Sequence, residues 1–127
     1  MQNLNSVSPF FIVADLKASL GFYEKMLGFA IWHIAPADEP FFTMVGRDGI
    51  SIMLKGDGMP RPNSTQYDWA RWDAYINTAN PDALYQEYKT ADVPFRQHLM
   101  DDDDGLRGFE VVDINGYVLF FGRPEHS

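Results

Sequence analysis

The fold is decided by a stretch that begins Phe11-Ile12-Val13-Ala14-Asp15 and ends Leu27-Gly28-Phe29. Its apolar start predicts a strand, Asp15 is typical of a helix N-cap, and Gly28 is typical of a helix end. Between them, apolar residues recur at the spacing of one helical face, at Leu16, Leu20, Tyr23 and Leu27. The stretch therefore predicts a strand followed by a helix that packs on a sheet.

The same order returns in the second half of the chain. A strand-like run, Tyr75-Ile76-Asn77-Thr78, leads to Asn80 as the expected N-cap and Pro81 at the first helical position. The helical pattern ends at Asp92-Val93, where Asp92 takes the place of the stopping glycine. The expected buried face of this second helix consists of Leu84, Tyr88 and Ala91.

Three strand-like runs follow each predicted helix. They span 30–34, 41–45 and 50–54 in the first half, and about 95–99, 107–112 and 117–121 in the second. Turn signals separate the last two runs of each half, at Asp48-Gly49 and at Asp113-Ile114-Asn115-Gly116. We predict an α+β fold, a single domain over residues 1–127 with two β-α-β-β-β modules at about 5–56 and 69–123, joined by a connection at about 57–68.

Composition limits the class of partner. The formal net charge is -8 and the pI is about 4.6, which disfavours nucleic acid and anionic membranes because both attract basic surfaces. The chain has no cysteine, so thiol catalysis and thiolate metal sites are excluded. No apolar run reaches membrane-spanning length, and the default expectation is a cytoplasmic protein. A neutral or cationic small molecule fits this composition best.

Several segments carry a family resemblance. They are Phe11 to Leu16, Ser19 to Tyr23, Leu27 to Phe29, Gly105-Leu106-Arg107-Gly108-Phe109 and Val112 to Gly116. In order and spacing the chain resembles the glyoxalase, bleomycin-resistance and extradiol-dioxygenase superfamily, also called vicinal oxygen chelate proteins, and most of all its bleomycin-resistance branch. The resemblance implies curved sheets that together enclose a ligand cavity, usually in a homodimer.

The resemblance also implies where a divalent metal would bind. Family enzymes hold the metal through the first and last strands of each module, and those positions correspond here to Ser8, Met53, Asp73 and Phe120. A metal needs about three or four N, O or S donors, and this set contains one carboxylate and one hydroxyl beside two apolar side chains. We therefore expect no metal and no other cofactor. Asp73 is expected to pair with Arg71 or Arg107, or to meet a cationic group of the ligand.

Aromatic side chains favour an apolar binding cavity. Strand alternation places Phe10 with Ser8 on one face, and Tyr75 with Asp73, while Phe11 and Val13 face the helix. Flat rings near carboxylates suit a planar, cationic ligand. The cavity would be lined by aromatic residues that include Phe42 and Trp69, and the predicted ligand-binding set is Ser8, Phe10, Trp32, Phe41, Met53, Trp72, Asp73, Tyr75, Arg107, Phe109 and Phe120.

The leading hypothesis is a metal-free protein that sequesters a cationic aromatic drug or metabolite, as in antibiotic resistance. The alternative is a metal-dependent lyase, isomerase or dioxygenase of the same superfamily, with His33, His98 and Asp73 as atypical ligands. A third possibility is an interaction module with a filled interior. No catalytic residue is predicted, since no serine lies in a Gly-x-Ser-x-Gly elbow.

The acidic run Asp101-Asp102-Asp103-Asp104 precedes the penultimate strand. Adjacent like charges repel each other, so we expect a solvated loop. A calcium site is not expected, because the spacing after Gly105 lacks the terminal Glu of an EF-hand loop. Asp104 also stands where relatives often carry an aromatic residue.

Overall fold

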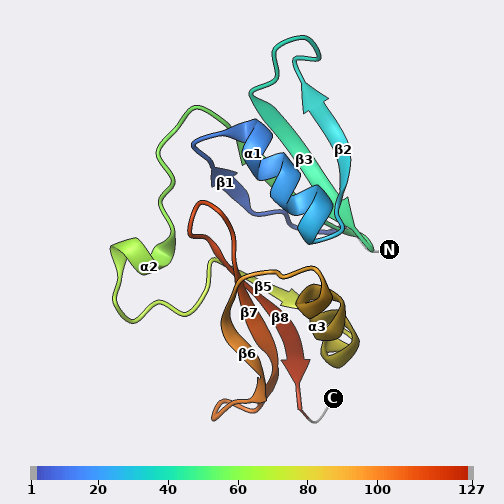
Figure 1. Cartoon of the computed structure of the whole chain (residues 1–127), viewed down its shortest axis with the longest axis vertical. Helices are drawn as coiled ribbons and strands as arrows, with labels where there is room; N and C mark the ends of the chain where they lie inside the picture. Colours follow the sequence, from blue (N-terminus) through green and yellow to red (C-terminus); the bar gives the residue numbers. More distant parts are fainter. Residues whose placement is uncertain (1–2, 126–127) are drawn as a thin grey trace. The chain divides into compact units, whose positions relative to one another are not determined.

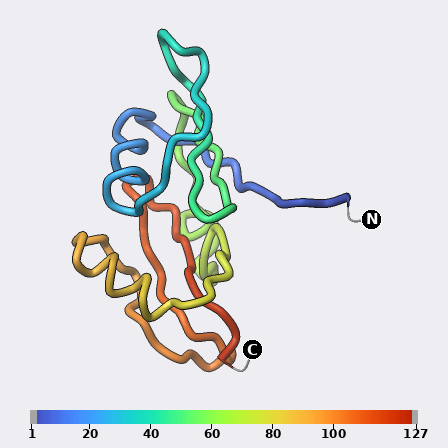
Figure 2. Tube along the Cα trace, turned by 90° about the vertical axis from the view of Figure 1, so that its right-hand side faces the viewer, coloured from blue at the N-terminus to red at the C-terminus, as the bar shows by residue number. Residues whose placement is uncertain are grey.

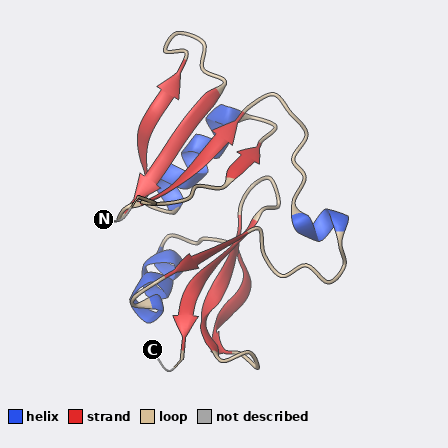
Figure 3. Cartoon of the chain, turned by 180° about the vertical axis from the view of Figure 1, so that it is seen from behind, coloured by secondary structure: helices blue, strands red, loops and turns tan. Residues whose placement is uncertain are grey.

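The computed structural model describes residues 3–125 and contains two compact units (Figure 1), one ending at Pro60 and one beginning at Arg61. The boundary lies inside the predicted connection at 57–68. Each unit contains one four-stranded sheet with a helix packed on one face (Figure 3), as the α+β prediction requires. The units are described separately below.

The first unit has the predicted β-α-β-β-β order. Its elements are β1(Phe10–Ile12), α1(Leu16–Gly21), a π-helical turn η1(Phe22–Met26), β2(Ala30–Ala35), β3(Phe42–Arg47) and β4(Ile50–Lys55). The strand order is β1-β4-β3-β2, with β1 parallel to β4 and the other pairs antiparallel. The strand at the start of this unit is short, because residues before Pro9 run extended and outside the sheet (Figure 2).

Local chemistry sets the ends of the first helix. The Asp15 side chain accepts a hydrogen bond from the Ala18 amide at 3.1 Å, which satisfies one free donor of the first turn. Gly28 has φ 76°, the left-handed conformation that glycine adopts without steric cost. Three residues of the predicted apolar stripe, Leu16, Tyr23 and Leu27, are buried, and the fourth, Leu20, is half-buried.

The second unit repeats the first. Its elements are α2(Asn63–Gln66) in the connection, β5(Ala74–Asn77), α3(Pro81–Thr90), β6(Phe95–Asp101), β7(Leu106–Val112) and β8(Val118–Pro124). The strand order β5-β8-β7-β6 has the same pattern as the first sheet, again with the first strand parallel to the last. The predicted duplication is thereby confirmed.

The second helix is rotated from its predicted orientation. Asn80 caps it through a 3.1 Å bond to the Ala83 amide, and Asp92 ends it with φ 58°, both as predicted. Tyr88 is buried, but the second buried tyrosine is Tyr85, and Leu84 is only half-buried. Tyr85 can be buried because its hydroxyl hydrogen-bonds the His98 ring at 2.7 Å. The predicted stripe included Tyr88 but not Tyr85, which lies about one turn before it on the buried side of the helix.

Candidate functional site

One row of side chains crosses the second sheet on the face away from α3. Tyr75 is the register partner of Phe120, Phe120 of Glu110, and Glu110 of Gln97. Directly paired residues point to the same side of a sheet, so the four side chains share a face. The neighbouring Phe109 and Phe121 contact Tyr88 of α3 and therefore occupy the opposite face. We call the first side the open face of the second sheet.

Three aromatic rings cluster on this open face. The Phe120 ring lies 4.7 Å from the Trp72 ring and 5.3 Å from the Tyr75 ring, with which it stacks. Gly108 and Gly122 make room for it, since a Cβ added to either residue would lie 2.6 Å from Phe120 ring atoms. Phe120 is fully buried, whereas Tyr75 is 39% exposed. Phe120 therefore forms the buried base of the cluster, and Trp72 and Tyr75 form its solvent-accessible part.

An ion pair between a buried carboxylate and an exposed arginine adjoins the aromatic cluster. Glu110 is 3% exposed, and its carboxylate lies 3.2 Å from Nε of Arg96 on β6. Burial raises the pKa of Glu110, and the Arg96 guanidinium opposes that shift only in part. The side-chain nitrogen of Gln97, the register partner of Glu110, is buried without a hydrogen-bond partner. A buried charge beside an unsatisfied amide is costly for folding, which marks this position as a functional candidate.

The Glu110→Gln variant is expected to change how stability depends on pH. Because the folded-state pKa of Glu110 is raised, the native protein binds more protons than the unfolded chain between the ordinary value of 4.5 and the raised value. Across that window the wild type should lose stability relative to Glu110→Gln as pH rises, and the difference should become constant above it. Urea unfolding of both proteins from pH 4 to 8 measures this. A difference that does not change with pH would contradict the buried environment of Glu110.

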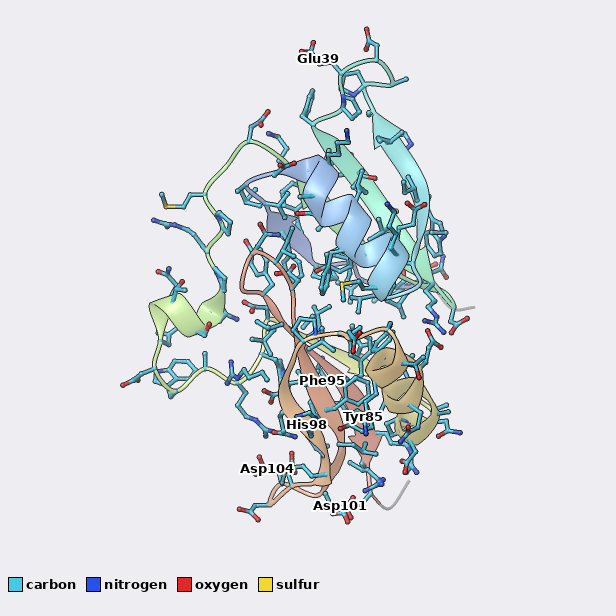
Figure 4. All side chains as sticks on the ribbon, in the orientation of Figure 1. Glu39, Tyr85, Phe95, His98, Asp101 and Asp104 are labelled. Carbon is cyan, nitrogen blue, oxygen red and sulfur yellow. The ribbon has the colours of Figure 1, made fainter. Side chains whose placement is uncertain are left out.

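Arg71, in the segment between α2 and β5, binds to the hairpin between β6 and β7. Its guanidinium lies 4.4 Å above the Trp72 ring and pairs with Asp102 at 3.0 Å and Asp104 at 2.6 Å. Burial opposes ionisation of Asp102, but hydrogen bonds from the Leu106 amide, Arg71 and the Asp104 amide together lower its pKa. The prediction of a solvated acidic run is wrong for Asp102, whose side chain is 10% exposed, whereas Asp104 stays largely exposed although it is paired. Figure 4 labels Asp104 and Asp101 at this hairpin.

Asp73 has a structural role that the sequence did not reveal. One carboxylate oxygen accepts the Asn63 amide at 2.7 Å and the other accepts the Val118 amide at 2.8 Å. The expected pairing with Arg71 or Arg107 is not seen, because backbone donors already occupy both oxygens. Asp73 thus links the start of α2 to the start of β8.

Arg107 and Phe109 lie on the helix side of the second sheet rather than on its open face. Arg107 forms two hydrogen bonds to the Asp82 carboxylate on α3, at 2.7 and 2.9 Å, and one to Asp101 at 3.0 Å. The hydrogen bonds to Asp82 and Asp101 raise the pKa of Arg107. Phe109 is fully buried against Tyr85 and Phe121. Neither residue is retained in the candidate site.

The open face of the first sheet carries the remaining predicted residues. Phe10 is 53% exposed, stacks with Phe42 at 6.2 Å, and is the register partner of Met53. Trp32 covers Gly46, where an added Cβ would meet its indole ring. Two further contacts are between the Ser8 and Ser51 hydroxyls, at 2.6 Å, and between Lys55 Nζ and the Phe41 ring, at 5.1 Å. Predicted residues therefore form an exposed aromatic surface on this unit as well.

Comparison with known proteins agrees with this architecture. The family model described as Glyoxalase/Bleomycin resistance protein/Dioxygenase superfamily matches residues 4–121. The chain belongs to this superfamily. No curated protein sequence matches it.

Solved structures of several proteins share the fold at low sequence identity. TioX from Micromonospora sp. ML1 aligns with TM-score 0.73 and 19% identity, over 96% of this chain and 99% of its own. A glyoxalase/bleomycin resistance protein/dioxygenase from Alicyclobacillus acidocaldarius aligns with TM-score 0.74 and 20% identity, over 98% and 95%. The bleomycin-binding protein of Streptomyces verticillus, in complex with copper(II)-bleomycin, aligns with TM-score 0.71 and 22% identity, over 98% and 99%.

The four positions that we predict to correspond to the superfamily's metal ligands do not present a suitable donor set. In the first unit Ser8 bonds Ser51 and the second position is the thioether Met53. In the second unit both oxygens of Asp73 accept backbone amides, and Phe120 offers no donor atom. Neither pair resembles the N and O donors of a divalent-metal site.

The atypical metal site of the alternative hypothesis is not supported by the placement of His98. Its ring lies on the helix side of the second sheet, next to the rings of Tyr85 and Phe95 (Figure 4), and is hydrogen-bonded to the Tyr85 hydroxyl. His33 lies on the first unit, with its ring 6.2 Å from that of Phe42. Over residues 3–125, no group of three or more His, Asp or Glu side chains is arranged to hold a metal ion.

Sequence reasoning overlooked Glu110, Arg96 and Arg71 as site residues. Glu110 carried a usable signal, since it is a charged residue inside the apolar run Phe109-Glu110-Val111 and alternates onto the face opposite Phe109. Arg96 carried none, because a register shift between Phe95 and Gln97 turns it toward Glu110.

Proposed function

We propose that this chain is a metal-free small-molecule-binding protein that sequesters a cationic aromatic drug or metabolite. The observation that supports the proposal most is the open face of the second sheet, where Trp72 and Tyr75 pack on Phe120, the register partner of the buried Glu110. Two solved neighbours are bleomycin-binding proteins in complex with bleomycin or its copper(II) form, which supports drug binding on this fold.

Charge at this face favours a cationic ligand. The carboxylates of Asp102, Asp104 and Glu110 are paired with only two guanidinium groups, those of Arg71 and Arg96. One negative charge is therefore left without a countercharge in this network, and burial of Glu110 strengthens its field. An aromatic cation could stack on Trp72 or Tyr75 while its charge lies in this potential.

The proposed protein acts in the cytoplasm as a homodimer, with the ligand held in a groove that two subunits share. Aromatic residues exposed on the open face of the first sheet, Phe10 and Trp32 among them, support such a shared groove. No helix among residues 3–125 is long and apolar enough to cross a membrane. Chemical turnover is not part of the proposal.

Three probes of one shape test the charge preference: 2-naphthylmethylamine, 2-naphthalenemethanol and 2-naphthoate. The wild type is expected to bind the amine about tenfold more tightly than the alcohol, which corresponds to about 1.4 kcal/mol. In Glu110→Gln this preference should disappear while affinity for the alcohol stays unchanged. Titration calorimetry, with and without EDTA, measures all three probes.

The outcomes of this experiment separate the parts of the proposal. Binding that is lost with EDTA would contradict the metal-free assignment. Equal binding of amine and alcohol by the wild type would contradict the cationic class. No saturable binding of any of the three probes would overturn the proposed function.

A further inference from the structure

A row of sulfur and nitrogen donors crosses the open face of the first sheet. His33 on β2 is the register partner of Met44 on β3, and Met44 is the register partner of Met53 on β4. Thr43 and Val45, on either side of Met44 in the chain, are fully buried, which places them on the helix side and Met44 on the open face. The imidazole and the two thioethers therefore project from one face at adjacent positions.

The spacing of these residues suits one bound ion. In antiparallel pairs, the Cβ atoms of directly paired residues lie about 4.5–5.5 Å apart, so an ion above Met44 has His33 and Met53 one strand away on each side. Methionine has three rotatable side-chain bonds, which lets both sulfurs turn toward such a point. Lys55, a cation on the same face, donates to the Gly56 carbonyl at 3.1 Å, and this contact holds its ammonium at the end of β4.

Aromatic rings lie on both sides of this row. Trp32 is the extra residue where β2 shifts register, and its indole ring covers Gly46, which follows Met44 by two residues and shares its face. Phe42 precedes Met44 by two residues, and its ring lies 6.2 Å from that of His33. The faces of aromatic rings attract cations electrostatically. The surroundings of the row thus favour a positively charged ligand.

The donor types decide which cation fits. Strands β1 to β4 contain no Asp or Glu, so calcium and magnesium, which bind through carboxylate and carbonyl oxygens, find no carboxylate there. Thioether sulfur is a soft ligand that selects Cu(I), and imidazole also suits copper. We propose that His33, Met44 and Met53 form a binding site for a soft monovalent metal ion, Cu(I) by its chemistry.

This site is separate from the small-molecule site proposed above. That site is assigned to the second sheet and uses no metal, whereas the soft-ion site belongs to the first unit. It also differs from the four positions that we predict to correspond to the superfamily's metal ligands, because only Met53 is common to both sets. The two proposals therefore depend on different residues.

Silver(I) is a suitable probe, because it is a soft monovalent ion like Cu(I) and is stable in air. Titration calorimetry of the full chain in chloride-free buffer is expected to show one Ag⁺ bound per chain. In a sample with ¹³C-labelled methionine methyl groups, Ag⁺ should shift the Met44 and Met53 signals with one midpoint. The signals of Met59 and Met100, which are 77% and 45% exposed, should stay in place.

Two substitutions with matched controls test the ligands. Met44→Leu keeps the side-chain volume and removes the sulfur, and it should weaken Ag⁺ binding at least tenfold. His33→Gln should have an effect of similar size. The controls Met100→Leu and His98→Gln change the same residue types in the second unit, and each should alter Ag⁺ affinity less than twofold. Circular dichroism verifies that all four variants are folded.

Three results would overturn the soft-ion site. The first is unchanged Ag⁺ affinity in Met44→Leu. The second is an equal shift of the Met59 and Met100 signals, which would mean that Ag⁺ binds exposed thioethers without selection. The third is binding of Zn²⁺ as tight as that of Ag⁺ at the Met44 signal. None of these measurements uses a naphthyl probe, so this proposal and the proposed function can fail separately.

Discussion

Replacing Phe109 with alanine is expected to lower the free energy of unfolding by about 3–5 kcal/mol, the usual loss for a fully buried phenylalanine. The ring is completely buried on the helix side of the second sheet, where it packs against Tyr85, Tyr88 and Phe121. The deletion would leave a cavity between β7 and α3 that rigid strands cannot close. Urea unfolding followed by circular dichroism measures the loss.

Phe10→Ala is the matched control for this experiment. It removes the same side chain from an exposed position on the first sheet, so its cost should stay below about 1 kcal/mol. Comparable losses in the two variants would contradict the assignment of Phe109 to the core. A folded Phe109→Ala protein should also keep its preference for the naphthylamine, because Phe109 does not reach the open face.

Replacing Asp73 with alanine is expected to cost about 2–4 kcal/mol, because two backbone amides lose a charged acceptor. The affected amides belong to Asn63 at the start of α2 and Val118 at the start of β8. Faster hydrogen exchange at these amides, together with a lower urea midpoint, would show that α2 has detached from the start of β8.

Asp73→Asn separates a structural role from a metal-binding role. The asparagine side chain retains one acceptor oxygen, so the stability loss should be smaller than that of Asp73→Ala. A metal ligand would show the reverse pattern, with little change in the stability of the metal-free protein and lost metal uptake. Elemental analysis of the wild type and both variants after incubation with zinc decides between these roles.

Much of the fold could be predicted because its signals are local. Asp15 and Asn80 cap helices through amides three residues away, and Asp92 ends a helix by its own backbone conformation. The Asp48-Gly49 turn has positive φ at both residues, as a tight hairpin requires. Each of these interactions joins residues that are close in the chain, so the local amino-acid sequence is sufficient to predict the caps and turns.

The site was less predictable because its residues meet across strands. Phe109 and Glu110 are adjacent in sequence, and only the pairing of β7 with its neighbours decides which one faces α3. The register shift in β6 turns Arg96 toward Glu110, and the residue types around Arg96 do not predict that shift. Likewise, the backbone amides that bind Asp73 come from positions 10 and 45 residues away along the chain.

The sequence by itself determined the duplicated β-α-β-β-β scaffold, its caps and turns, and that three of the four predicted metal positions, Ser8, Met53 and Phe120, carry neither histidine nor carboxylate. These properties depend on residue identity and short-range hydrogen bonding. Only the tertiary structure decided that Phe109 and Arg107 lie on the helix side of the second sheet. It also decided that Asp73 links α2 to β8, and that Glu110 is buried and paired with Arg96. The physical reason is that burial and ion pairing depend on strand register and loop closure, which bring distant residues together.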